Sequence, residues 1–231
     1  VYKRQLVDRA GGDGRQVLTA LEVACALAGH RHVELTHVEA ALGTTALRYG
    51  RDDHYDVVSA FIKSMRGSDP DAAIYWLARM LEAGEDARFI ARRMIIFASE
   101  DVGLADPGAL QVAVAAAHAL EHVGLPEAQL NLAEAAIYLA RSPKSNRAAL
   151  AIWNARADVR NGAVGEVPAH LRDAHYQGAS SLGHGDGYEY PHDHASGTVD
   201  QQYLPDALVG RRWYDPSAHG DEPTLGSTEA P

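Results

Sequence analysis

From residue 55 to about residue 162, apolar residues recur every three or four positions, which is the spacing of an amphipathic helix. Asp69 before Pro70 and Asp106 before Pro107 mark helix starts, because aspartate caps a helix and proline fits its first turn. The pattern predicts helices over residues 55–66, 70–83, 87–102, 107–122, 126–140 and 142–161. Since the alternation typical of strands does not occur in this range, the predicted fold class is all-α.

The first 43 residues are also predicted to be helical, with a break at the glycine-rich residues 11–14. The T-x-x-E sequence at residues 36–39 is a capping box, which predicts that a short helix begins there. Residues 44–54 are polar and poorly periodic, so we interpret them as a linker.

Beyond residue 162 the chain is predicted to be rich in loops, because residues 177–200 hold five glycines together with tyrosines and histidines. A short helix is expected at residues 205–209. Residues 218–231 are rich in Gly, Pro, Thr and Glu and are predicted to form a disordered tail. The predicted helical domain therefore spans residues 55–217.

The composition excludes several classes of protein. Among 231 residues, 21 Lys and Arg oppose 31 Asp and Glu, and the net charge of −10 excludes a generally basic nucleic-acid-coating protein, though not a local basic surface. A single cysteine, Cys25, excludes a disulfide framework and a multi-cysteine zinc site, and its apolar neighbours predict a buried thiol. No apolar run reaches the roughly 18 residues of a membrane span, and no signal-peptide core follows Val1, so a cytoplasmic protein is expected.

The chain has no P-loop, the glycine-rich cradle whose Gly-Lys pair holds phosphates in many ATPases. Its three lysines, Lys3, Lys63 and Lys144, follow Tyr, Ile and Pro rather than glycine. The residues themselves therefore do not predict ATP binding by this device.

The order of residues between the helix signals resembles one known family. Matching strings run through residues 59–73, 75–86, 90–93, 98–107, 136–140, 143–146, 167–172, 188–193, 203–205 and 210–214, among them Ala98-Ser99-Glu100-Asp101-Val102-Gly103 and Tyr188-Glu189-Tyr190-Pro191-His192-Asp193. They resemble the C-terminal half of the replication-associated recombination protein A family, also called MgsA, whose eukaryotic relatives are the Werner-helicase-interacting ATPases. The resemblance covers nearly the whole chain.

The resemblance implies a bacterial AAA+ ATPase related to clamp loaders, with a P-loop module, a helical lid and a C-terminal helical domain that assembles homotetramers. Residues 1–43 then resemble the end of the lid and residues 55–217 the collar-like tetramer-forming domain. The chain is expected to be a fragment without the core that binds ATP and magnesium. The intact protein is expected to be a nucleoid-associated, DNA-dependent ATPase of replication-fork maintenance, recombination and DNA repair. Its implied partners are forked or single-stranded DNA and single-strand-binding protein.

One motif resembles the sensor-2 element of the AAA+ lid, written G-D-x-R-x-x-L. It is Gly12-Asp13-Gly14-Arg15-Gln16-Val17-Leu18. A guanidinium suits this role because it is always charged and offers a fork of donors to phosphate oxygens. By this resemblance Arg15 is the nucleotide-sensing residue, and the alternative is an exposed arginine at a helix start.

A basic set of side chains surrounds the last predicted helix and includes one acid, Asp158. Its members are Arg141, Lys144, Arg147, Arg156 and Arg160. They are candidate contacts to DNA phosphates, as are Arg88, Arg92 and Arg93. The alternative is a solvated helix face or salt bridges between subunits.

Two other functions remain open. The main alternative is a helical adaptor that itself binds DNA or a replication protein. A hydrolase with a metal at His192-Asp193-His194 is the other, but these residues belong to a family string, and His192 is expected to hydrogen-bond its own loop. Neither a catalytic residue nor a metal ligand is therefore expected in this chain. Trp76 and Trp153 lie among apolar residues and are predicted to be core or subunit-interface side chains.

Overall fold

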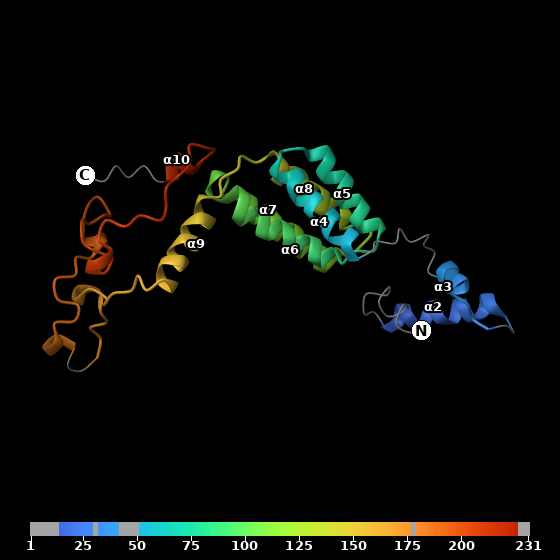
Figure 1. The fold of residues 1–231 in the computed structure, drawn as a ribbon, viewed down its shortest axis with the longest axis horizontal. Coiled ribbons are helices and arrows are strands. Elements are labelled where there is room, and N and C mark those ends of the chain that lie inside the picture. The colour runs from blue at the N-terminus through green and yellow to red at the C-terminus, as the bar shows by residue number, and fades with distance from the viewer. Residues whose placement is uncertain (1–13, 30–31, 42–50, 177–178, 226–231) are drawn as a thin grey trace. The chain divides into compact units, whose positions relative to one another are not determined.

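The computed structural model describes residues 14–29, 32–41, 51–176 and 179–225, whose course is drawn in Figure 1. The α-helices are α2 (Gly14–Ala28), α3 (Leu35–Ala41), α4 (Arg51–Arg66), α5 (Pro70–Glu82), α6 (Ala87–Phe97), α7 (Gly108–Val123), α8 (Gln129–Arg141), α9 (Arg147–Arg160) and α10 (Glu222–Leu225). Shorter helical turns lie at Ala98–Val102, Gly103–Ala105, Ala169–Leu171, Ala179–Leu182, Pro191–Asp193 and Asp206–Leu208. No strand occurs in these described ranges, so the prediction of an all-α fold is confirmed.

The chain divides into two compact units. The first comprises Val1–Asn146 together with Ser217–Pro231, and the second comprises Arg147–Pro216. The second unit thus begins with α9, inside the range 55–217 that the sequence assigns to one domain. Within the described ranges, no helix combines the length and the apolar character needed to cross a bilayer.

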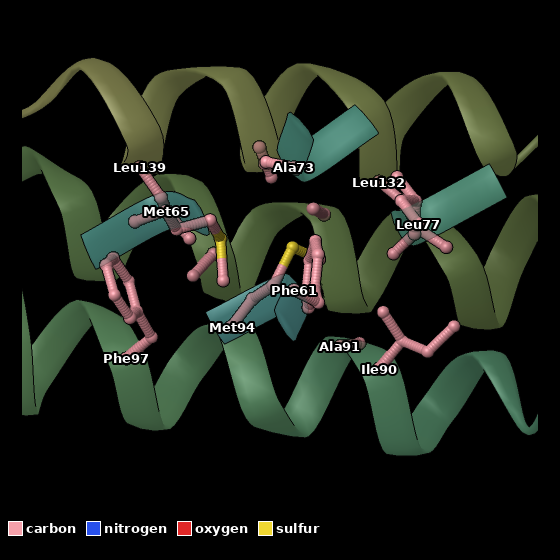
Figure 2. Close-up of a cluster of buried hydrophobic side chains, with 14 of the residues drawn as sticks. Phe61, Met65, Ala73, Leu77, Ile90, Ala91, Met94, Phe97, Leu132 and Leu139 are labelled. Atoms are coloured by element: carbon pink, nitrogen blue, oxygen red, sulfur yellow. The ribbon is translucent and has the colours of Figure 1, made fainter. Parts of the chain in front are cut away.

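The helices α4 to α8 of the first unit pack around one apolar core. Figure 2 shows its central side chains pointing toward one another from several helices. They are Phe61, Met65, Ala73, Leu77, Ile90, Ala91, Met94, Phe97, Leu132 and Leu139. Two predicted caps start their helices as expected, because Asp69 accepts a hydrogen bond from the Ala72 N–H at 2.9 Å and Asp86 accepts one from Arg88 at 2.9 Å.

Asp106 joins the start of α7 to the end of α8. Its carboxylate accepts hydrogen bonds from the Gly108 N–H at 3.0 Å, the Tyr138 hydroxyl at 3.3 Å and the Ser142 hydroxyl at 2.8 Å. The preceding Gly103 has a φ of 54°, and a Cβ added there would lie 2.6 Å from a backbone oxygen. This end of the bundle is therefore fixed by one carboxylate and by a close backbone approach that only glycine allows.

The C-terminal segment returns to this end of the first unit. The Asp221 N–H donates to the Ala105 carbonyl at 2.9 Å, and Nδ1 of His219 donates to the Lys144 carbonyl at 2.9 Å. Glu222 is fully buried and accepts hydrogen bonds from the backbone and the hydroxyl of Ser217. Residues 218–225, for which the sequence predicts a disordered tail, are thus held by contacts to the bundle that local composition does not encode.

The helices α2 and α3 pack on each other through Ala20, Ala24 and Val38. Cys25 is exposed, so the prediction of a buried thiol is wrong. The reason is that α2 buries only its alanine face, and Cys25 points about 100° away from Ala24. The predicted capping box at residues 36–39 does not mark the start of the next helix, because α3 begins one residue earlier, at Leu35. The Glu34 N–H before this helix donates to the His37 ring at 3.0 Å.

The predicted linker overlaps the first turn of α4. Residues 51–54 belong to this helix, whereas residues 44–50 lie outside the described residues. His54, in that first turn, reaches Glu85 of the turn between α5 and α6 with an ion-pair distance of 2.5 Å. The start of α4 is therefore attached to the bundle.

Candidate functional site

The predicted nucleotide-sensing residue, Arg15, lies in the first turn of α2. Its side chain lies outside the described residues, as do residues 12 and 13 of the motif. The sensor-2 assignment therefore stays a prediction.

The predicted basic set is divided between the two units. Arg141 and Lys144 belong to the first unit, and Arg147, Arg156 and Arg160 are in α9 of the second. Because successive helical residues are about 100° apart, Arg156 and Arg160 share a face while Arg147 lies on the opposite one. Arg147 is paired with Asp215 at 3.3 Å. The structure thus brings two of the five side chains together on one face.

Lys144 is occupied inside the first unit. Its ammonium group donates to the Ala140 carbonyl at 3.0 Å, to the Ser142 carbonyl and to the Ser68 hydroxyl at 3.3 Å. Burial lowers the pKa of Lys144, while the negative charge of Asp101 opposes that shift. A lysine that binds the last carbonyls of α8 in this way is a poor contact for an external phosphate.

Other arginines of the first unit are occupied by ion pairs. Arg88 pairs with Glu121 at 2.7 Å, and Arg92 approaches Asp86 at 3.5 Å. The buried Nε atom of Arg93 has no hydrogen-bond partner among the described residues. Arg88 and Arg92 are therefore engaged in ion pairs within the chain, whereas the sequence left open phosphate contacts or salt bridges between subunits.

Asp158 anchors α9 to its own unit. Its carboxylate accepts from the Arg211 guanidinium, with a shortest distance of 2.7 Å, and from the Trp213 indole N–H at 2.8 Å. The Trp213 and Arg211 hydrogen bonds hold the pKa of Asp158 below its usual range. Sequence reasoning did not assign a role to Arg211 or Trp213, although both lie in the family string at residues 210–214.

This contact predicts a specific pH dependence. Because the folded state lowers the pKa of Asp158, the contact stabilises the fold at neutral pH and is lost as the pH falls through the lowered value. The indole N–H resonance of Trp213 should therefore keep its position through the usual aspartate range and shift only below it. The substitution Asp158→Asn should shift this resonance at neutral pH, whereas Asp200→Asn, at an exposed site, should leave it unchanged. A midpoint within the usual aspartate range would contradict the assignment.

The outer face of α9 is apolar and basic at once. None of the residues of α9 is buried, and Ile152, Trp153 and Val159 are 55%, 49% and 58% exposed. At about 100° per residue these three side chains share a face roughly 120° wide with Arg156 and Arg160. The acid that could neutralise this face, Asp158, is turned to the other side and bound there. This surface, which we call the α9 face, can take a flat apolar or aromatic partner that carries negative charge.

A second exposed surface lies on α8. Leu130, Glu134, Ile137, Tyr138 and Arg141 are all exposed and occupy about 100° of the helix, so they form one stripe, the α8 face. A hollow of about 470 Å³ opens beside its C-terminal half. The opposite side of the same helix contributes Leu132 and Leu139 to the core (Figure 2).

The predicted loop histidines do not form a metal centre in the described part of the chain. The rings of His192 and Tyr190 contact each other at a tilt of 53°, with 5.0 Å between their centroids. No group of three or more His, Cys, Asp and Glu side chains gathers as metal ligands among the described residues.

Comparison with known protein families identifies the family to which the chain belongs. The sequence matches the family described as MgsA AAA+ ATPase C terminal over residues 67–229, which is more than half of the chain. The chain belongs to this family. Residues 2–66 match a second family, described as AAA C-terminal domain, so the two matches meet at the turn after α4.

Several relatives of this MgsA-family chain are named replication-associated recombination protein A. It is 48% identical over 217 residues to the replication-associated recombination protein A of Bacillus subtilis, covering 91% of this chain and 51% of the relative. It is 38% identical over 232 residues to the Escherichia coli protein of the same name, covering 97% and 52%. An uncharacterized AAA domain-containing protein of Mycobacterium tuberculosis is 56% identical over 221 residues, covering 94% and 49%. The chain spans about half the length of the curated relatives it matches.

The described residues of this MgsA-family chain do not form an ATP site of the P-loop kind. Neither described lysine follows a glycine, Lys144 is bound to carbonyls, and Lys63 is exposed on α4. The described residues also lack a cluster of ligands for a divalent ion.

Proposed function

We propose that this chain joins several copies of a AAA+ ATPase into one assembly, a tetramer, that acts at replication forks in recombination and repair. The observation that carries the proposal is the α9 face. A helix of 14 residues with no buried side chain and with an exposed tryptophan, isoleucine and valine lacks the partner that such a face normally has.

Burial against another copy would stabilise these side chains. Covering a fully exposed isoleucine or valine contributes roughly 1.5–3 kcal/mol, and tryptophan is enriched among the residues that dominate protein interfaces. The α9 face therefore combines apolar and aromatic side chains with two arginines, a residue type enriched at interfaces.

An assembly of this kind gives a chain without a P-loop a role in an ATPase, which is to hold several ATPase modules together. Joining four modules that each contact DNA weakly raises the effective concentration of every module at the same substrate. We propose forked or single-stranded DNA as that substrate and single-strand-binding protein as a further partner of the whole protein. ATP and magnesium stay the proposed cofactors of the whole protein.

The mass of the unmodified chain in solution tests this proposal. Size-exclusion chromatography with light scattering at micromolar concentration should give about four times the 24.8 kDa of one chain. A mass of one chain over the whole concentration range would overturn the proposed assembly.

A second candidate function is favoured by the same face. Arg156 and Arg160 have no ion-pair partner among the described residues, and they share a face with Trp153, an exposed ring on which a base could stack. This arrangement suits single-stranded DNA, with the arginines on phosphates and the indole under a base.

Charge reversal separates the two candidates. If α9 binds DNA, Arg156→Glu and Arg160→Glu should each weaken salt-dependent binding of single-stranded DNA at least several-fold. The control Lys63→Glu makes the same charge change at an exposed site of α4 and should have little effect. Unchanged affinity in both α9 variants would exclude α9 as a DNA contact, while the mass of the assembly tests the first candidate independently.

A further inference from the structure

The α8 face has an internal symmetry in its order of residues. Ile137 and Tyr138 lie at its middle, Glu134 precedes them, and Arg141 follows them. The acid and the base are equally far, 3.5 residues, from the point midway between Ile137 and Tyr138. Neither charge has an ion-pair or hydrogen-bond partner among the described residues. The stripe is thus apolar at its centre, with one unpaired charge of each sign at matched positions.

We propose that the α8 face binds the same face of a second copy, with the two α8 helices antiparallel about a two-fold axis between Ile137 and Tyr138. The proposal rests on the proposed assembly function and names one of its surfaces. In an antiparallel pair with this centre, Glu134 of each copy lies opposite Arg141 of the other. A two-fold axis generates this ion pair twice, as self-complementary interfaces require.

The hollow beside the stripe supports the same arrangement. It is lined by Tyr138, Arg141 and Pro143, among others, and lies along the C-terminal half of the face. Leu130 is 70% exposed at the N-terminal end of the same face. In the antiparallel pair the N-terminal half of one helix covers the C-terminal half of the other, so Leu130 of one copy enters the hollow of its partner. Both halves of the face thereby find an apolar complement.

The face is also held in shape before it binds. The Tyr138 hydroxyl donates to Asp106 at 3.3 Å, and the same carboxylate accepts from Ser142 at 2.8 Å. Leu132 and Leu139 fix the inner side of α8 in the core. A preorganised helix face loses little conformational entropy on pairing, which favours a short interface of this kind. A partner surface with charges of one sign only would place a like charge against either Glu134 or Arg141. Charge complementarity therefore favours a second copy of this chain.

The arrangement also accounts for assembly beyond a dimer. An isologous contact closes on itself and joins only two copies. The α8 face in the first unit and the α9 face in the second are separate surfaces, so a further contact at the α9 face can join two α8 pairs into a tetramer.

Exchanging the two charges tests the proposal in the full chain. Glu134→Arg opposes arginines across the axis, and Arg141→Glu opposes glutamates, so each variant should halve the mass measured by light scattering. The double variant restores the pairs and should recover the unmodified mass. An equimolar mixture of the two single variants should form mixed assemblies, because one copy then carries two arginines and the other two glutamates.

A control variant and the pattern of masses distinguish failure of the α8 contact from failure of the proposed assembly. Glu82→Arg makes the same charge change at an exposed site of α5 and should leave the mass unchanged. Circular dichroism should show the same helix content for all variants. Unmodified mass in both single variants overturns the α8 contact while the assembly stands. Loss in the single variants without recovery in the double variant overturns the charge pairing, and a monomeric unmodified chain overturns both proposals.

Discussion

The substitution Trp153→Glu is expected to halve the mass of the assembly at micromolar concentration. Trp153 is half exposed at the edge of the α9 face, beside Ile152, and none of the residues of α9 is buried in its own unit. The substitution removes the indole, the largest apolar side chain of the face, and puts in its place a carboxylate whose hydration opposes burial in the contact. Light scattering and sedimentation velocity measure the change directly.

The substitution should act on assembly and leave the fold intact. Because Trp153 contributes nothing to the core of the first unit, the thermal unfolding of the bundle α4 to α8 should be unchanged at concentrations where both proteins are dissociated. Thr198→Glu adds the same charge at an exposed site of the second unit and should not change the mass. An unmodified mass in Trp153→Glu would remove the α9 face from the assembly.

The largest effect on stability is expected from Leu139→Ala. Leu139 is completely buried between the helices of the bundle (Figure 2), and its truncation removes apolar contacts and leaves a cavity. Such substitutions lower the free energy of unfolding by about 2–5 kcal/mol. Urea unfolding followed by circular dichroism, at one protein concentration, measures the difference from the unmodified chain.

Leu110→Ala provides the matched control for this prediction. Leu110 lies on α7 of the same bundle but is exposed, so the same truncation should lower the free energy of unfolding by less than about 1 kcal/mol. Equal losses in the two variants would show that the core is not centred where the structure places it.

The sequence predicts those features of the fold that depend on residues close together in the chain, such as helix caps and hydrophobic periodicity. Asp69 and Asp86 cap α5 and α6 through bonds to backbone groups two or three residues away, and a sequence shows such pairs directly. The all-α class follows from periodicity in the same way. The bounds of α9 were less accurate, because it begins at Arg147 rather than near Ser142. Ser142 is bound to Asp106, 36 positions away, and a bond of that kind leaves no local signal.

The candidate site was predictable only in its composition. The sequence shows that basic residues cluster near α9. It does not show that Asp158 is turned away and bound by Arg211 and Trp213, which lie more than 50 positions later. Nor does it show that Lys144 folds back onto the carbonyls at the end of α8. Core and interface residues share one periodicity, so only burial in the structure distinguishes Leu139 from Leu130.

Sedimentation velocity on four forms of the chain tests the central claim, that two separate faces assemble copies of it, most directly. The forms are the unmodified chain, Trp153→Glu, Glu134→Arg and the combination of both substitutions. The expected masses are about four, two, two and one times 24.8 kDa, respectively. An unmodified chain that sediments as a single copy at every concentration would contradict this claim.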